Sequence, residues 1–304
     1  EWTGGELVES VRIEAGGDGK VTLFSGTQGM GQGLETAFSQ LLSGQLEIPI
    51  EAIRVVQGDS ARVKGLGSFG SRSLVVGGSV LQVGAQEFLE KGKQLAAAEL
   101  EAAIVDMRYH EGRFKVVGTS IGIGLFELAA SQAEHSFSTE TEKEVEGRSW
   151  PNGCHIAEVE IDPETGSVRL VSHGSVEDAG NLINPMIVEG QLQGGIAQGA
   201  GQALLELSEY DSEGQLLTGS FMDYAMPRAD DLPFFNTNIY TDAPCKTNPL
   251  GAKGVGENGV VGSIPAIANA VFDVLWEHGV RHFDMPAHPQ KIWKLLQNQK
   301  SVAN

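Results

Sequence analysis

Glycine most constrains how this chain can fold, because it fills 40 of 304 positions and gathers in short loops. The densest loop, Gly251–Gly259, holds four glycines in nine residues and one carboxylate, Glu257. Glycine tolerates positive φ and carries no side chain, so such a loop can turn sharply and approach a ligand closely. The apolar run from Ala266 to Trp276 beyond it is spaced as a buried helix. Glu257 is therefore either a candidate general base or a solvated acid of a surface loop.

Composition limits the classes of protein and partner. The chain is 41% hydrophobic and 20% charged, which is typical of a globular protein with one large or two medium domains. A formal net charge of −19 argues against a nucleic-acid partner. We find no apolar run of the roughly 18 residues that a membrane helix needs, and we expect no membrane span.

Cysteine and histidine give no pattern typical of a metal site. Cys154 and Cys245 lack Cys-x-x-Cys spacing, which excludes a zinc site or four iron–sulfur ligands from this chain. The seven histidines, among them His110, His155 and His173, form no ligand-like cluster in the sequence. Few cysteines favour a reducing compartment, and we expect a cytoplasmic protein.

The chain opens with Glu1-Trp2-Thr3-Gly4-Gly5, which includes neither an initiator Met nor the pattern of a signal peptide. We expect an upstream segment. Alternation over Leu7–Ala15 and Lys20–Ser25, around the turn at residues 16–19, predicts a β-hairpin. The loop Gly26–Gly33 follows and leads into a helix that begins at Leu34. A glycine loop before a helix start suits phosphate or another electron-rich group.

Further elements follow in order. Ile53–Gln57 predicts a strand, and Gly65–Ser73 is a second loop whose hydroxyls and one arginine could bind an anion or only solubilise the surface. Apolar spacing over Leu74–Val105 predicts one long helix or two. Gln132–Gly147 is polar and acidic, and we expect a surface excursion near a subdomain boundary there.

The second half of the chain resembles the first. His155–Ile161 and Val168–Ser172 predict a hairpin, and Gly166–His173 matches Gly19–Gly26 at its Gly, Val, Leu and Ser positions. A glutamine-rich and glycine-rich helix lies within Asn184–Glu206. Repeated glycines in a helix cost about 1 kcal/mol each, which indicates close packing or a ligand. Carboxamides present a donor beside an acceptor, which matches the edge of a pterin or another heterocycle.

Three stretches together resemble one family. They are Met30-Gly31-Gln32-Gly33-Leu34-Glu35-Thr36, the segment from Asn184-Pro185 through Gly190-Gln191 to Gln198-Gly199, and Gly254-Val255-Gly256-Glu257. In order and separation they resemble the C-terminal half of the molybdopterin-binding large subunit of the molybdenum hydroxylases, the xanthine dehydrogenase, aldehyde oxidase and aerobic carbon monoxide dehydrogenase family. The resemblance covers nearly the whole chain. It implies an α+β fold of mixed sheets with packed helices in two related subdomains, approximately residues 1–147 and 148–304.

The resemblance also implies roles for individual residues. Gln32 and Gln191 match glutamines that hydrogen-bond molybdopterin, and Glu257 matches the glutamate beside the metal. In the family that glutamate takes a proton from a metal-bound hydroxyl, which attacks an electron-poor carbon while hydride passes to a sulfido ligand, so water supplies the oxygen. The other implied cofactor-binding residues are Gly31, Gly33, Gly70, Ser71, Arg72, Ser73, Gln198, Lys253, Gly254, Val255 and Gly256. No protein side chain would bind the molybdenum, which the pterin dithiolene holds.

Partners follow from the same resemblance. The cofactor would be molybdopterin, as such or as its cytosine dinucleotide, completed by the remaining half of the subunit. Electrons would leave through [2Fe-2S] clusters and FAD on partner chains or domains. The chain departs from the family at Asp178-Ala179-Gly180, where Asp-Cys-Gly is usual. The substrate, an N-heterocycle, an aldehyde or carbon monoxide, stays open because much of its pocket lies in the missing half.

Two other functions are compatible with the motifs. In a NAD-dependent dehydrogenase, the loop from Gly29 to Gly33 would bind the dinucleotide and Asp59 the ribose. The spacing is Gly-x-Gly-x-Gly instead of Gly-x-Gly-x-x-Gly, and Asp59 comes later than the usual interval of about 20 residues. In a non-enzymatic scaffold the glycine loops would serve packing alone.

Overall fold

The chain begins with the hairpin that the sequence predicts. In the computed structural model, which describes residues 5–300, strands β1 (Val8–Gly16) and β2 (Val21–Ser25) pair antiparallel, with Val11 opposite Ser25. Alternate side chains such as Ile13 and Leu23 are fully buried, as a half-buried sheet requires. Residues 1–4, which carry most of the argument for an upstream segment, lie outside the described residues.

A four-stranded sheet forms around this hairpin in the order β3-β2-β1-β7. Strand β3 (Ile53–Gln57) lies parallel to β2, and helix α1 (Leu34–Leu46) makes the crossover. Strand β7 (Ser136–Glu144) lies antiparallel to β1. The prediction of a surface excursion over Gln132–Gly147 was therefore wrong. This segment is polar because β7 is an edge strand in which only Phe137 and Thr141 are buried.

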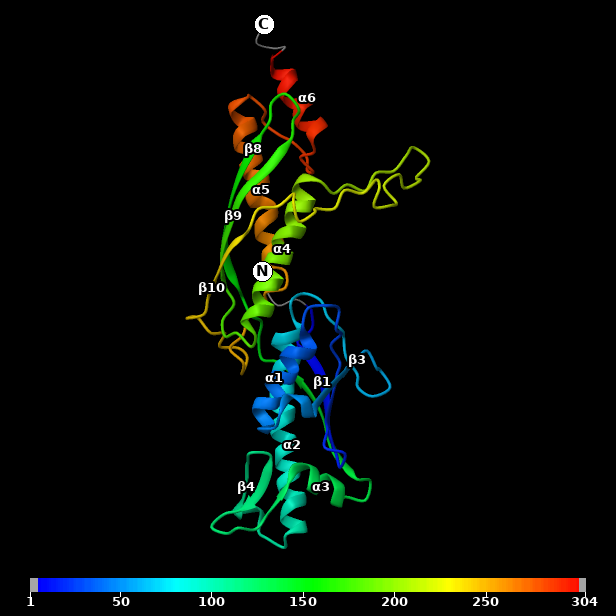
Figure 1. Cartoon of the computed structure of the whole chain (residues 1–304), viewed down its shortest axis with the longest axis vertical. Helices are drawn as coiled ribbons and strands as arrows, with labels where there is room; N and C mark the ends of the chain where they lie inside the picture. Colours follow the sequence, from blue (N-terminus) through cyan, green and yellow to red (C-terminus); the bar gives the residue numbers. More distant parts are fainter. Residues whose placement is uncertain (1–4, 301–304) are drawn as a thin grey trace.

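Helices and a small sheet complete the first body (Figure 1). The predicted helical stretch Leu74–Val105 is one long helix, preceded by a π-helical turn and followed by a 3₁₀ turn. The remaining elements are the π turn Ser73–Gly77, α2 (Gly78–Glu99), the 3₁₀ turns Ile50–Ala52 and Ile104–Asp106, β4 (Met107–His110), β5 (Arg113–Val116), β6 (Gly122–Gly124) and α3 (Leu125–Ser131). Phe88 of α2 stacks on Phe137 of β7, with ring centroids 4.7 Å apart. The core thus lies between α2 and the sheet.

The second body is built around strands β8 (Asn152–Ile161), β9 (Val168–Asp178) and β10 (Asn236–Tyr240) in the order β10-β9-β8. Helices α4 (Pro185–Leu204), α5 (Asn258–Glu277) and α6 (Pro289–Lys300) pack beside it (Figure 1). Side chains from the sheet and all three helices share one core, which includes Leu170, Ala200, Ile267 and Ile292.

Both bodies contain the same sequence of elements. In the first, a hairpin, a crossover helix, a parallel third strand and a second helix follow one another as β1, β2, α1, β3 and α2. In the second, β8, β9, α4, β10 and α5 repeat that order with the same strand orientations. The prediction of an α+β fold in two related subdomains is confirmed, and the boundary near residue 147 stays a prediction.

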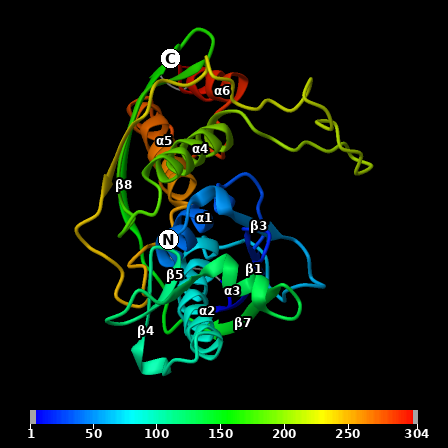
Figure 2. The same ribbon diagram turned by 60° about the horizontal axis from the view of Figure 1, so that its bottom comes forward.

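One segment projects away from both bodies. Residues 205–235, between α4 and β10, form the long excursion seen on the right of Figure 2. Leu205, Leu232 and Phe235 at its two ends pack against the core of the second body. Apolar side chains between them are exposed, with Phe221 at 83% and Met222 at 92% of their full accessibility. Exposed apolar side chains gathered on one segment are typical of an interface.

Helix α5 corrects the expectation about membrane-length apolar runs. It has 20 residues and a mean hydropathy of 1.5, which are long and apolar enough for a membrane helix by length and composition alone. Glycines, a serine and Pro265 interrupt its strongly apolar residues, so no unbroken run is visible in the sequence. In the structure α5 packs on α4 and β8, and buries Ile267, Val271 and Leu275 at helical spacing.

Glycines set the closest approach between α4 and α5. A Cβ atom added to Gly195 would lie 2.9 Å from the Gly259 Cα atom, and one on Gly199 would lie 2.0 Å from the Ser263 Oγ atom. Gly190 and Gly194, on another side of α4, have open space instead. Close helix packing therefore accounts for only part of the glycine content of α4.

Gly195→Ala should lower the free energy of unfolding by about 1 to 3 kcal/mol, because the new methyl group forces two packed backbones apart. Gly194→Ala, on the same helix with open space, should raise it by up to about 1 kcal/mol through helix propensity. Urea denaturation of both variants measures the difference. Equal effects of the two substitutions would contradict the close contact.

Candidate functional site

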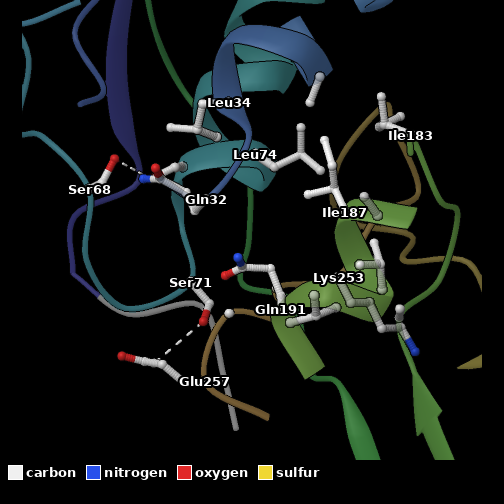
Figure 3. Close-up of a pocket in the computed structure, with 18 of the residues that line it drawn as sticks. Gln32, Leu34, Ser68, Ser71, Leu74, Ile183, Ile187, Gln191, Lys253 and Glu257 are labelled. Carbon is white, nitrogen blue, oxygen red and sulfur yellow. Dashed lines mark hydrogen bonds between the residues drawn. The ribbon is translucent and has the colours of Figure 1, made fainter. Parts of the chain in front are cut away.

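A cavity of about 240 Å³ lies where the two bodies meet (Figure 3). Five stretches of chain line it: residues 30–37, 68–74, 179–188, Gln191 and 252–257. The first two come from the first body and the others from the second. Loops far apart in sequence thus build one hollow, in which most of the predicted site residues meet.

The first glycine loop is held by its own glutamine. Gln32 accepts a hydrogen bond from the Met30 N–H at 2.6 Å and donates one to the Gln28 carbonyl at 2.9 Å. Gly31 and Gly33 have φ of 95° and 79°, a region that other residues rarely adopt. A Cβ on Gly33 would lie 2.8 Å from Ile187, so this glycine also lets the loop approach α4. Gln32 lines the cavity, while Gly31 and Gly33 shape the loop beside it.

The second loop is fastened to the first by hydroxyl groups. Ser68 Oγ donates to the Gln28 carbonyl at 2.6 Å and accepts from the Gln28 N–H at 3.1 Å. Ser73 Oγ donates to Ser68 Oγ at 2.7 Å. Gly70, Ser71 and Ser73 all line the cavity. The predicted anion-binding loop therefore faces the hollow, although part of its hydroxyl set joins the two loops.

Arg72 does not line this cavity. Its side chain is fully buried and forms an ion pair with the equally buried Glu9, with Nη1 and Oε2 2.8 Å apart. The guanidinium also donates to the carbonyls of Glu6, Val8 and Gly67, at 3.1, 2.6 and 3.2 Å. Arg72 therefore links the second loop to β1, and its guanidinium is not accessible to an anion in the cavity.

The two predicted glutamines of α4 lie in different surroundings. Gln191 is half-buried, lines the cavity, and makes no side-chain hydrogen bond within the part of the chain that the structure describes. Gln198, two turns further along, is exposed and lies outside the cavity lining. Asn184 caps the start of α4, because its Oδ1 atom accepts from the Ile187 N–H at 3.0 Å.

The third glycine loop closes the cavity from the second body. Lys253 Nζ pairs with Asp178 Oδ2 at 2.5 Å, and both side chains are largely buried. Gly254 donates its N–H to Ser149 Oγ at 3.1 Å. A Cβ on Gly254 would lie 2.5 Å from the Ser71 carbonyl oxygen, so only glycine allows this contact between loops. Lys253, Gly254, Val255 and Gly256 all line the cavity.

Glu257 stands at the edge of the cavity, one residue before α5. Its side chain is exposed, and Ser71 Oγ donates to Glu257 Oε2 at 3.4 Å (Figure 3). Glu257 Oε1 has no hydrogen-bond partner among residues 5–300. A free carboxylate oxygen beside a hollow can accept a proton, as a general base must.

Sequence reasoning missed the apolar walls and one buried polar group of residues. Leu34 of α1, Leu74 of the π turn and Ile187 of α4 line the cavity (Figure 3). Between the start of α5 and strands β8 and β9, the side chains of His155, Glu177 and Asn258 are buried together. His155 and Glu177 are 22 positions apart, so the sequence does not reveal this contact, and only the pairing register of β8 and β9 could have indicated it. No group of three His, Cys, Asp or Glu side chains within the described residues is placed to hold a metal ion.

Comparison with known proteins decides the family. Residues 2–233 match the family model described as "Molybdopterin cofactor-binding domain". The chain belongs to the molybdopterin cofactor-binding family. The recognition made from the three sequence stretches is thereby confirmed.

Relatives of this family cover almost the whole chain. It is 35% identical to subunit gamma of the 6-hydroxypseudooxynicotine dehydrogenase complex of Paenarthrobacter nicotinovorans, over 96% of the chain and 38% of the relative. It is 34% identical to the carbon monoxide dehydrogenase large chain of Hydrogenophaga pseudoflava, over 95% and 37%. Quinoline 2-oxidoreductase from Pseudomonas putida 86 superposes with a TM-score of 0.83 and 34% identity, over 95% and 38%. The chain thus spans well under half of these relatives.

The cavity of this molybdopterin-family chain fits a flat, polar heterocycle. Gln191 offers a carboxamide with no partner among residues 5–300, and Gly70, Gly254 and Gly256 offer bare backbone. Leu34, Leu74 and Ile187 provide apolar surface for the faces of a ring. Such a combination of apolar walls and few polar groups is usual in cofactor sites.

Arg72→Leu should lower the free energy of unfolding by about 3 to 5 kcal/mol, because it leaves the Glu9 carboxylate buried without its cation. Arg12→Leu is the control, since Arg12 pairs with Glu14 at a half-exposed position and should cost far less. Chemical denaturation compares the two. Unchanged stability in Arg72→Leu, together with loss of bound cofactor, would return Arg72 to the cofactor site.

Proposed function

We propose that this chain is the cofactor-binding part of a molybdenum hydroxylase, which hydroxylates an electron-poor carbon of an N-heterocycle or aldehyde with oxygen from water. The observation that carries the proposal is the single cavity in which Gln32, Gln191 and Glu257 meet from three separate segments. The family match supports molybdopterin as the group that this cavity takes.

The chain's own residues would hold the cofactor by its edges. Gln191 would hydrogen-bond the pterin, because its carboxamide faces the cavity without a partner among the described residues. Gln32 has a second N–H and a second lone pair beyond its bonds within the loop, and would add further contacts. Gly70, Ser71, Ser73 and the backbone from Lys253 to Gly256 would close around the remainder.

When bound, the cofactor supplies the two-electron redox centre and the activated oxygen of the reaction. Glu257 acts as the general base, with Oε1 as the atom that accepts the proton. Ser71 donates to the other oxygen, Oε2, and so holds the carboxylate at the edge of the cavity (Figure 3).

We further propose that other polypeptide completes the enzyme. The match covers 96% of this chain but only 38% of one relative, and 95% and 37% for another, so both relatives are roughly two and a half times as long as this chain. One of them is named as a subunit of a complex. The remaining part of the molybdopterin subunit would close the open side of the cavity. Iron–sulfur and flavin partners would remove the electrons. This chain has only two cysteines, Cys154 and Cys245, and cannot supply the four ligands of an iron–sulfur cluster. We place this assembly in the cytoplasm, and the cofactor is molybdopterin or its cytosine dinucleotide.

A nicotinamide enzyme has one point in its favour. The loop from Gly29 to Gly33 does connect β2 to α1, and β3 returns parallel to β2. However, the sheet continues on its other side with antiparallel β1 and β7, unlike a doubly wound dinucleotide fold. The family match favours molybdopterin over this function and over a scaffold.

Glu257→Gln should leave the molybdenum content of the purified complex intact and lower turnover by several orders of magnitude, because an amide cannot accept the proton. Turnover is measured with aldehydes and N-heterocycles and a dye as electron acceptor. Near-normal turnover in this variant would remove the general-base assignment.

Gln191→Ala should reduce bound cofactor, because the cavity loses a hydrogen-bonding group that no neighbour replaces. Gln193→Ala is the matched control, since Gln193 lies on the same helix and bonds Glu189 at 3.0 Å instead of lining the cavity. Molybdenum per complex, determined by elemental analysis, gives the result. Full occupancy in Gln191→Ala would count against the assigned contact.

A further inference from the structure

A group of buried polar side chains lies directly behind the start of α5. His155 Nε2 contacts Glu177 Oε1 at 2.5 Å, and Asn258 Nδ2 donates to Glu177 Oε2 at 3.0 Å. His155 and Glu177 side chains are 5% and 2% exposed, and Asn258 is 6% exposed. Both oxygens of one buried carboxylate are therefore taken, one by strand β8 and the other by the first residue of α5.

Glycines make room for this group. On the paired strands β8 and β9, Gly153 stands opposite Glu177, and a Cβ on Gly153 would lie 2.1 Å from Glu177 Oε2. A Cβ on Gly262 of α5 would lie 2.2 Å from the His155 ring. The His155 imidazole therefore lies directly against the backbone of α5, and the hairpin of β8 and β9 packs closely on this helix.

The surroundings of Glu177 leave it few other partners. A buried carboxylate is stable only when it is paired and hydrogen-bonded. His173 lies beside His155, with ring centroids 5.2 Å apart, and both its ring nitrogens lack a partner among the described residues. Burial, and secondly the charge of His155, lower the pKa of His173 to about 4, so it is neutral at pH 7. His155 and Asn258 therefore provide the hydrogen bonds that the buried Glu177 carboxylate needs.

Glu257 and Asn258 are consecutive residues whose side chains contact different parts of the protein. Glu257 contacts Ser71 at the cavity (Figure 3). The Asn258 side chain instead donates to the buried Glu177 carboxylate. The Glu257 carbonyl accepts from the Val261 N–H at 3.0 Å, and the Asn258 N–H donates to Val255 at 3.3 Å. The backbone of Glu257 is thus hydrogen-bonded to the first turn of α5, and the Asn258 side chain anchors that turn to Glu177 of β9.

We propose that Glu177 and Asn258, supported by His155, are positioning residues that fix the first turn of α5 and thereby hold the Glu257 carboxylate at the cavity. They act through the backbone, and none of the three lines the cavity. The link to catalysis rests on the proposed function, whereas the anchoring of α5 does not. Loss of the anchor should let the first turn open locally while the remainder of the chain keeps its stability.

Hydrogen exchange of the Val261 amide tests the anchor, because this amide bonds the Glu257 carbonyl. In Asn258→Ala, measured by mass spectrometry on the full complex, exchange at Val261 should rise on the order of 10- to 100-fold, as expected for loss of one hydrogen bond to a charged group. Amides of β1 and β2 should keep their rates. Asn269→Ala, at an exposed position of the same helix, is the matched control and should leave Val261 unchanged.

A second variant protects the test against misfolding. Asn258→Ser keeps a hydroxyl donor beside Glu177, and exchange at Val261 should fall between wild type and Asn258→Ala. No change at Val261 in both variants would overturn the proposal. An equal rise at Val261, β1 and β2 would also overturn it, because it would show a general loss of stability.

Turnover separates positioning from the proposed function. In the loaded complex, Asn258→Ala should lower kcat by about 10-fold or more with KM and molybdenum content unchanged, since the base is present but misplaced. Faster exchange at Val261 with unchanged kcat would overturn the positioning role. If the complex proves to lack molybdenum, the proposed function fails, and the exchange result still decides whether Asn258 anchors α5.

Discussion

Backbone contact between loops of the two bodies is the constraint on which the site depends. Gly254 touches the Ser71 backbone, and Gly33 lies against Ile187 of α4. A side chain at Gly254 would clash with the Ser71 backbone, and one at Gly33 would displace the Ile187 side chain. Glycine is entropically costly in an ordered structure, and its use here is explained by contacts that no other residue permits.

Repetition of one unit explains why the cavity lies at this place. In each body a glycine loop or turn leads from the second strand into a helix, α1 or α4. The starts of both helices meet at the cavity, each with a glutamine nearby, Gln32 and Gln191. Helix starts carry unpaired N–H groups and the positive end of the helix dipole. Two related units that face each other can thus surround a polar ligand from both sides.

Local patterns predicted most of the fold, and long-range contacts account for what they missed. The hairpins and the helix after Gly33 were confirmed because period and turn residues are local signals. Strand β7 escaped because an edge strand buries few side chains and so looks like a polar loop. Arg72 was assigned to the ligand because its partner, Glu9, lies 63 residues away and one arginine in a serine loop suggests an anion. The fully buried ion pair could be found only in three dimensions.

Binding of a molybdenum-bearing pterin in this cavity is the proposal on which the assigned residue roles depend. Acid treatment of the purified intact complex releases and oxidises a bound pterin to fluorescent products, and the same sample can be analysed for molybdenum. We expect both fluorescent pterin products and molybdenum, in equal molar amounts and close to one per chain. A complex with neither, or one that releases a nicotinamide nucleotide instead, would contradict it.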